Sequence, residues 1–478
     1  MFFRRILAFV ALAGLLLGSL GACTPEANPP QTVAAGNPAA VPRPSPLPRA
    51  IERETGPVYN SPQLQALVDR IGNRLVSQSN LPGTYRFYIL DQPLPNAHAV
   101  SGGYVFVTRG LLAMVDDDAE LAAAMSHELG HLTQRHAAQR EQARKGVIDA
   151  AVQAAMTSGS VQVGRSAASN GMLELRRYSR EQELEADRVG LSYLVKAGYR
   201  GDAMAGLIDK LRRQSRLEDE LLGVEERGGQ TSSASTHPAP SDRLSALQTI
   251  PAARQPGEAD RAGYLALIDG MSVDDAPEEG FVRGSTFLHP TMRLAFEAPS
   301  DFRLLNDHDG VFGFGRDRSA MNFSCSPDKV AGRLDDWMRN KLKPTPTDIE
   351  ATTIGGMEAA IGARPRGADT GLAQVRYVLI RFGDGVCYFN LASDGPDRDR
   401  RIDVLLNAAR SFRALTAAEA AALKPYRLHI VPRGSGSAAQ YAQRLPYGDH
   451  RMARLLALNG VDNAAEFTQR SEIKLVEP

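Results

Sequence analysis

Two histidines and a glutamate stand close together in one alanine-rich stretch, and their types and spacing could bind a metal and use it. His127 and His131 are four residues apart, with Glu128 beside the first. Residues four apart on a helix project from one face, so both imidazoles can reach one ion while Glu128 takes a proton from its water. The pattern predicts a zinc site with Glu128 as the catalytic base. The alternative, a surface helix with solvated histidines, fits poorly because the apolar Met125 and Leu129 lie within the motif region.

A catalytic zinc also needs a third protein ligand and an open position for water. The stretch from residue 178 to about Gly198 has the apolar spacing of a second helix, and Glu183 and Asp187 lie four residues apart on it. We predict that Glu183 is the third ligand and that Asp187 accepts a hydrogen bond from a ligand histidine. A plain charged helix face stays open as an alternative, since periodicity does not separate the two.

The elements that must position these residues can be outlined from apolar periodicity. We expect a helix over residues 61–76, strands over 85–90 and 104–107, and a helix that begins near Asp116 and carries the two histidines. The strand Tyr104–Val107 is a candidate edge on which an extended substrate could pair. The Ala-, Ser- and Gly-rich segment 147–172 is interpreted as a mobile flap over the cleft, with a plain linker as the alternative.

Three blocks in this order, which start at Asn96, Asp118 and Tyr178, together resemble the M48 family of zinc metallopeptidases in its HtpX- and BepA-like form. The resemblance covers a domain expected at residues 56–255. It implies an α+β protein with a mainly helical HExxH gluzincin peptidase domain and a small β-sheet, and one Zn²⁺ per chain. It also implies that Glu183 is the third ligand, with Glu128 as base and Asp187 behind a ligand histidine.

Two further histidines, His136 and His237, lie where metal binding has to be considered. His136 lies about 140° round a continuous helix from His131, so a structural role is favoured over a ligand role. His237 lies in the polar stretch 232–244, which resembles a segment in which BepA-like members can fill the open zinc position with histidine. His237 is therefore either a regulatory fourth ligand or an ordinary surface residue.

The amino terminus is expected to be an export signal. Residues 1–22 combine basic Arg4 and Arg5 with an apolar run, and Cys23 follows as in a bacterial lipoprotein. We predict lipidation of Cys23, a proline-rich tether over 23–55, and a place on the periplasmic face of the outer membrane. An uncleaved membrane anchor is the alternative.

Composition limits the other possibilities. The chain has 478 residues, enough for two or three domains, and 55 basic residues balance 55 acidic ones. This balance argues against a nucleic-acid partner, and three cysteines are too few for a disulfide scaffold. A linker at 256–280 is expected to lead to an α+β accessory domain at 281–418. Its Cys325 and Cys387 either form a disulfide or stay buried as thiols.

The end of the chain, residues 424–478, reads as strand, helix, helix, strand, a βααβ-like module. It weakly resembles a LysM module, which implies peptidoglycan as a partner. Residues 434–436 are Gly-Ser-Gly where that module usually has Gly-Asp-Thr, and this departure counts against glycan binding.

Two functions remain after this reading. The first is a zinc endopeptidase that degrades misfolded or stalled proteins of the cell envelope. The second is a periplasmic scaffold or chaperone lipoprotein with a structural zinc. The complete HExxH motif favours the first, because a structural site has no need of the Glu128 base.

Overall fold

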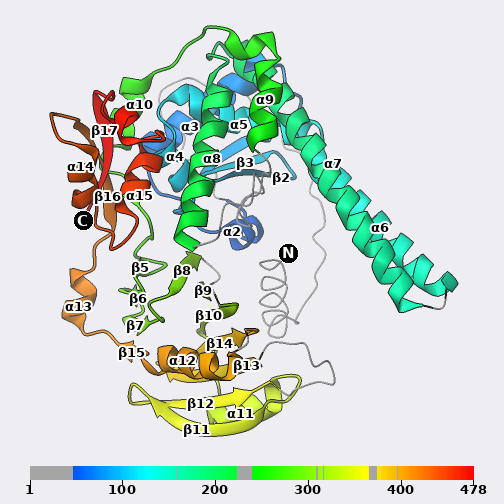
Figure 1. Ribbon diagram of the computed structural model, residues 1–478, viewed down its shortest axis with the longest axis vertical. Helices are drawn as coiled ribbons and strands as arrows, with labels where there is room; N and C mark the ends of the chain where they lie inside the picture. The colour runs from blue at the N-terminus through cyan, green and yellow to red at the C-terminus, as the bar shows by residue number, and fades with distance from the viewer. Residues whose placement is uncertain are drawn as a thin grey trace. The chain divides into compact units, whose positions relative to one another are not determined.

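The computed structural model describes residues 47–158, 160–222, 240–307, 310–315, 317–364, 374–395 and 397–478. The chain divides into two compact units. Residues Pro44–Ala276 and Pro425–Pro478 form one, here called the helical unit, and Pro277–Lys424 form most of the other, the sheet unit. The α+β fold class predicted from the sequence is confirmed, with a helical region that carries the His-His-Glu group and a small sheet (Figure 1). Among the described residues, no helix is long and apolar enough to cross a membrane.

The first part of the helical unit supplies the elements around the metal motif. Its elements in chain order are α2 (Arg49–Thr55), α3 (Pro62–Gln78), β1 (Arg86–Leu90), β2 (Ala97–Val100), β3 (Tyr104–Thr108), α4 (Arg109–Met114), α5 (Asp118–Thr133), α6 (His136–Ser158), α7 (Val161–Lys196), α8 (Ala203–Leu222), α9 (Pro240–Gln248) and α10 (Arg261–Ile268). Apolar side chains of α3, the strands and α5 join one core, as their periodicity predicts.

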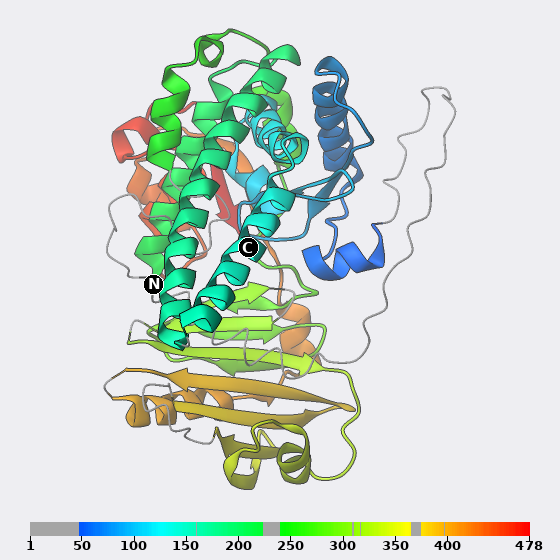
Figure 2. The same cartoon turned by 90° about the vertical axis from the view of Figure 1, so that its right-hand side faces the viewer.

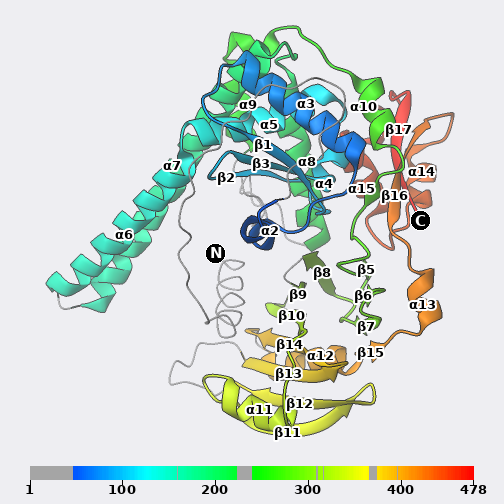
Figure 3. The same ribbon diagram turned by 180° about the vertical axis from the view of Figure 1, so that it is seen from behind.

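The small sheet of this unit corrects one prediction. Its strand order is β1-β3-β2, with β3 parallel to β1 and antiparallel to β2 (Figure 3). The strand at Tyr104–Val107 is therefore central, and its hydrogen-bonding groups already serve two neighbours. The prediction that it is an edge was wrong, because alternating apolar residues do not tell a central strand from an edge strand. Among the described residues, β2 is at the edge on that side, and it packs against α5.

The segment predicted as a flap is helical. It forms the end of α6 and the first third of α7, and these two long helices pack side by side as a hairpin, the teal pair in Figure 2. The second half of α7 returns to pack against α5. One uninterrupted helix thus runs from the tip of the hairpin to the metal motif.

The end of the chain has the predicted order of elements. These are β16 (Tyr426–Pro432), α14 (Ala438–Arg444), α15 (Arg451–Leu458), the short α16 (Ala464–Phe467) and β17 (Glu472–Glu477), and the sheet order is β17-β16-β4, where β4 is Ser272–Val273. Leu428, Leu455 and Phe467 are buried in the same core cluster as Leu112 of α4 and Leu121 of α5. The terminal segment and the metal-motif helices therefore share one hydrophobic core.

A buried charge cluster lies in the same region, just before α5 begins. The Asp116 carboxylate lies 3.0 Å from Lys210 Nζ and 3.0 Å from Lys474 Nζ. Arg261 and Arg470 place guanidinium nitrogens 3.1 and 3.3 Å from it. Lys474 also donates hydrogen bonds to the carbonyls that precede Asp116 in the chain. The last strand thus holds the start of the metal-motif helix through charge as well as through apolar contact.

The sheet unit is built from antiparallel strands with helices packed on them. Its elements are β5 (Phe281–Arg283), β6 (Thr286–His289), β7 (Leu294–Glu297), β8 (Phe302–Asp307), β9 (Gly310–Gly315), β10 (Ser319–Ser326), α11 (Leu334–Lys341), β11 (Thr347–Ile354), β12 (Met357–Ala363), β13 (Gln374–Phe382), β14 (Gly385–Ser393), α12 (Arg398–Arg410), β15 (Arg413–Ala414) and α13 (Ala417–Ala422). One sheet has the order β11-β12-β13-β14-β10-β9-β8 and another the order β15-β7-β6-β5.

The core of the sheet unit is rich in phenylalanine. Phe296, Phe323, Phe389 and Phe412 contact one another there. Cys325 and Cys387, which the sequence left as either thiols or a pair, are joined by a disulfide between the neighbouring strands β10 and β14. Such a bond is typical of proteins that fold in an oxidising compartment.

Candidate metal centre

Two helices bring the metal-binding side chains together, and each has a defined end. Helix α5 begins after Asp117, whose carboxylate accepts a hydrogen bond from the Glu120 backbone N–H at 2.9 Å. Helix α7 ends where Gly198 adopts a left-handed φ of 83°, a conformation that glycine takes without steric cost. These ends set which turns of the two helices face each other.

Glycines let α5 and α7 approach closely at the site. A Cβ on Gly190 of α7 would lie 2.9 Å from both the Ser126 carbonyl oxygen and the His127 nitrogen of α5. A Cβ on Gly130 of α5 would lie 2.9 Å from the Ala186 carbonyl oxygen of α7. These are backbone atoms that cannot rotate away, so the closeness of the helices depends on glycine at both positions.

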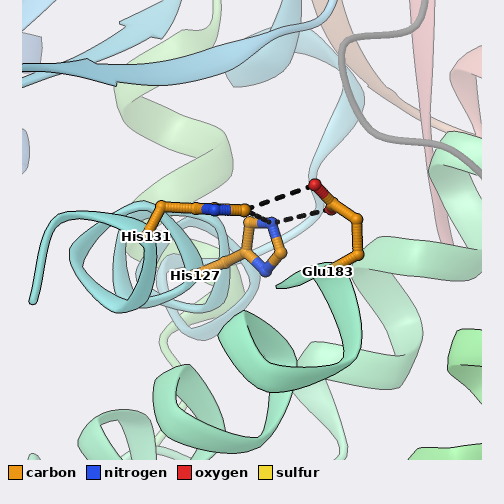
Figure 4. A group of neighbouring side chains, drawn as sticks. All are labelled: His127, His131 and Glu183. Atoms are coloured by element: carbon orange, nitrogen blue, oxygen red, sulfur yellow. Dashed lines mark hydrogen bonds and ion pairs between the residues drawn. The ribbon is translucent and has the colours of Figure 1, made fainter. Parts of the chain in front are cut away.

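Three predicted ligands converge in the space that this approach creates. Figure 4 shows His127 and His131 on α5 facing Glu183 on α7. The Nε2 atoms of His127 and His131 are 3.1 Å apart. The two carboxylate oxygens of Glu183 approach one histidine each: Oε2 lies 3.4 Å from His127 Nε2, and Oε1 lies 3.4 Å from His131 Nε2. All three side chains are buried, and they offer one ligand atom each within 4.8 Å of one another. The structure thus joins residues that are more than fifty positions apart in the sequence.

This arrangement fits zinc. Tetrahedral zinc with bonds of about 2.0–2.1 Å to nitrogen and oxygen separates its ligand atoms by roughly 3.3 Å, close to the separations seen here. Glu128 is also buried, and its charge acts on His131 and on Arg243. Buried carboxylates of Glu128, Glu183 and Asp187 thus outnumber the buried guanidinium of Arg243, an excess that favours a bound cation.

Asp187 lies beside one of the two histidines. Its carboxylate lies 2.9 Å from Nδ1 of His127, so the Nε2 atom of that ring is left to face the metal position. Arg243 of α9 donates two hydrogen bonds of 2.7 Å to the same carboxylate, and its third nitrogen lies 3.6 Å from Glu183. Arg243 therefore ties α9 to Asp187 and Glu183 of α7.

His136 plays the matching part for the other ligand. Its Nδ1 lies 2.9 Å from Nδ1 of His131, and its Nε2 lies 3.3 Å from a carboxylate oxygen of Glu185. The structural role favoured from the sequence holds, but its geometric reason was wrong. The helix does not continue from His131 to His136, because the chain turns at Arg135, which has a left-handed φ of 59°.

The electrostatics of the site follow from burial and from these contacts. Burial lowers the pKa of His131, which favours the neutral imidazole that binds a metal. Burial also acts to lower the pKa of His127, but hydrogen bonds to Asp187 and Glu183 outweigh it and raise that pKa. Burial alone would raise the pKa of Asp187, whereas Arg243 and His127 hold it well below its ordinary value. Asp187 therefore stays ionised beside the ligand histidine.

Sequence reasoning found part of this site and missed part of it. His127, Glu128, His131, Glu183 and Asp187 lie together as expected. Arg243, Glu185 and the two contact glycines were not singled out, because their roles depend on partners from other helices. The one signal for Arg243 in the sequence was its place in the same polar stretch as His237. His237 and Cys23 lie outside the described residues.

The close approach of the helices leads to a prediction. Replacement of Gly190 by Ala is expected to push α7 away from His127 and to weaken zinc binding by about tenfold or more, as the loss of an orienting contact does. Gly146→Ala is the matched control, because a Cβ there meets nothing within 4 Å in the middle of α6. Zinc affinity measured with a competing chelator separates the two, and equal affinity in both variants would contradict the role given to Gly190.

Comparisons with known proteins agree with the geometry. Residues 62–251 match the model of peptidase family M48. A Vibrio cholerae protein is 34% identical over 271 residues, which are 51% of this chain and 52% of that protein. The beta-barrel assembly-enhancing protease of Escherichia coli K12 is 30% identical over 40% of each chain. The metalloprotease LoiP of the same organism is 29% identical over 38% of this chain and 66% of its own.

These matches have a limited extent. The chain spans about half the length of the Vibrio cholerae relative and two fifths of the Escherichia coli assembly-enhancing protease. The residues that match the family model include α3 to α9 and every side chain of the metal centre.

Proposed function

We propose that this chain, whose residues 62–251 form a zinc metallopeptidase domain of family M48, is an endopeptidase that cleaves misfolded or stalled proteins of the bacterial cell envelope. The observation that carries the proposal is the buried convergence of His127, His131 and Glu183 beside Glu128. A structural zinc is usually closed by four protein ligands, whereas three protein ligands are found together here among the described residues.

The residues of the site have distinct tasks in this proposal. His127, His131 and Glu183 hold the metal, which when bound polarises the peptide carbonyl and makes a water acidic. Glu128 accepts the proton of the attacking water and returns it to the departing amine nitrogen. Asp187 and His136 keep the ligand imidazoles in the orientation that points both Nε2 atoms at the metal.

The substrate is an extended segment of polypeptide. Among the residues that the structure describes, strand β2 is at the edge of its sheet, and it packs against α5, the helix that carries Glu128. An extended chain can add to such a strand as a further strand through backbone hydrogen bonds. This requirement selects unfolded segments, because a folded substrate keeps its backbone groups paired.

The place of action is the envelope. Relatives named as assembly-enhancing proteases support this choice, as does the disulfide in the sheet unit. We propose that an export signal at 1–22 and a lipid on Cys23 attach the chain to the periplasmic face of the outer membrane through the tether 23–55. The accessory domain 281–418 would place substrates, and a LysM-like segment at 424–478 would contact peptidoglycan.

His237 would regulate the site. It is proposed as a removable fourth ligand, because it belongs to the stretch that leads directly into α9, whose Arg243 holds Asp187 and approaches Glu183. Displacement of that stretch would open the position that water needs.

The test is a proteolysis time course with the full chain and an unfolded envelope protein. Cleavage is expected with zinc bound, to stop when a chelator removes it and to return with added zinc. His237→Ala, run in parallel, is expected to cleave at least as fast as the wild type. If neither the wild type nor His237→Ala cleaves any of several unfolded proteins while zinc is bound, the result would instead support a scaffold or chaperone with a structural zinc.

A further inference from the structure

The outer part of the α6–α7 hairpin exposes large apolar side chains. Among the described residues, eight large apolar side chains are exposed, and six of them lie on these two helices. They are Ile148, Val152 and Met156 on α6, and Val163, Met172 and Leu173 on α7. Met156 is 75% exposed. The helices extend away from the rest of the helical unit in both face views (Figures 1 and 3). Exposed apolar surface concentrated in one element marks a contact site.

The packing inside the hairpin makes this exposure more informative. The two helices approach closely at glycines of α7, since a Cβ on Gly164 would lie 2.7 Å from Ala155 and one on Gly171 would lie 2.5 Å from the side chain of Val147. Ile148, Val152 and Met156 follow at intervals of four, so they form a stripe along α6 that faces away from α7. A hairpin that is stable in water normally places its largest apolar residues inside. Here glycines face Ala155 and Val147 at the contact while Ile148, Val152 and Met156 are exposed, and close packing at glycine is typical of helices that pack in lipid.

The charges around this apolar stripe are not random. Between residues 140 and 180 there are seven Arg or Lys and three Asp or Glu, a net +4 in a chain whose total net charge is 0. Arg144 and Lys145 precede the stripe on α6, and Arg177 follows the apolar residues on α7. Their side chains are 57%, 69% and 70% exposed. Each of them also lies near a glutamate, since Arg144 and Lys145 are 3.0 and 3.7 Å from Glu141 and Arg177 is 3.4 Å from Glu181. The border of the apolar region therefore carries both signs of charge, with cations in excess on the two helices together.

We propose that the hairpin tip inserts shallowly into the surface of an anionic phospholipid membrane. Its apolar side chains would enter the boundary of the acyl chains, while the bordering Arg and Lys meet the phosphates. The insertion is shallow, since neither helix is long and apolar enough to cross a bilayer. The proposal does not depend on peptidase activity or on lipidation of Cys23.

A polypeptide is the competing occupant of the same stripe. The charge pattern favours lipid, because an excess of cations beside an apolar surface matches a layer of phosphates above acyl chains. An unfolded polypeptide has no such fixed layer of negative charge. The test below lets either occupant appear.

The experiment reads the environment of the tip directly. Met156→Cys is labelled with an environment-sensitive fluorophore in the full chain, and unmodified chain treated in the same way reports any labelling of Cys23. Gln78→Cys, at the exposed end of α3, is the matched control in the same unit. Each protein is mixed with phosphatidylcholine vesicles, with or without phosphatidylglycerol, that carry a nitroxide quencher in the acyl region.

The fluorescence emission of the label at residue 156 is expected to shift to the blue and to be quenched on vesicles that contain phosphatidylglycerol. The emission of the label at residue 78 is expected to stay that of a label in water. Arg144→Ser with Lys145→Ser in the labelled chain should weaken this binding about fivefold per cation removed. A label at 156 that stays in water on both vesicle types overturns the proposal. If that label shifts only when an unfolded polypeptide is added, the stripe is a protein contact and the lipid proposal is wrong.

Discussion

Glu128→Gln is expected to slow proteolysis by at least about a hundredfold, because general acid–base groups contribute roughly 10²- to 10⁴-fold. Glutamine keeps the size of the side chain, but it does not take a proton from water at neutral pH. The ligands His127, His131 and Glu183 are unchanged, so zinc affinity should stay within a fewfold. The measurement pairs initial rates of cleavage with zinc titration of the same protein samples.

The control for this prediction is Glu185→Gln. Glu185 lies two residues after Glu183, and its carboxylate is 3.3 Å from Nε2 of His136. Its replacement should reduce zinc affinity moderately while the rate of the fully loaded enzyme changes little. If Glu128→Gln loses activity only in proportion to lost zinc, Glu128 does not act as the base.

Asp116→Asn is expected to lower the free energy of unfolding of the helical unit by about 3–5 kcal/mol, the usual cost of removing one partner from a buried ion pair. The replacement leaves the side chains of Lys210, Lys474, Arg261 and Arg470 in place without the carboxylate that they share. Urea unfolding followed by circular dichroism measures the change. The replacement would affect function only through the position of α5, the helix with the two histidines, which begins two residues after Asp116.

Asp462→Asn is the matched control. Asp462, like Asp116, faces several cations, and these are Arg212, Arg213 and Arg216. Its side chain is 32% exposed, whereas that of Asp116 is 8% exposed. Solvent screening limits exposed ion pairs to about 0–1 kcal/mol. Equal losses in the two variants would show that burial does not decide the effect.

The same cluster predicts an acid sensitivity. Burial alone would raise the pKa of Asp116, but Lys474 and Lys210 hold it well below its ordinary value. A carboxyl group whose pKa falls on folding stabilises the protein above its unfolded pKa of about 4, and that contribution is lost as the pH falls further. The difference in stability between wild type and Asp116→Asn should therefore shrink in acid.

The metal ligands could be predicted from the sequence because the evidence for them is local. His127 and His131 are separated by one helical turn, and the same holds for Glu183 and Asp187. The partners that orient them could not be found in this way. Arg243 meets Asp187 across 56 positions of the chain, and no periodicity distinguishes it from the other basic residues.

Two expectations show the same limit of the sequence, and the structure contradicts the first of them. The strand Tyr104–Val107 was predicted as an edge because strand propensity does not reveal neighbours, and the structure gives it one on each side. Segment 147–172 was interpreted as a flap because Ala, Gly and Ser are poor indicators of a core. Its small residues pack helix against helix instead, as Gly164 does against Ala155.

Helix α7 also sets a length scale for catalysis. It carries both Val163, near the tip of the hairpin, and Glu183, at the metal. At about 1.5 Å per residue, these positions are roughly 30 Å apart along a straight helix. A tip resting on a bilayer would therefore keep the reacting centre within about that height of the lipid. Peptide bonds in loops that stand farther from the membrane would be spared, so the helix would act as a ruler that selects substrates by their distance from the surface.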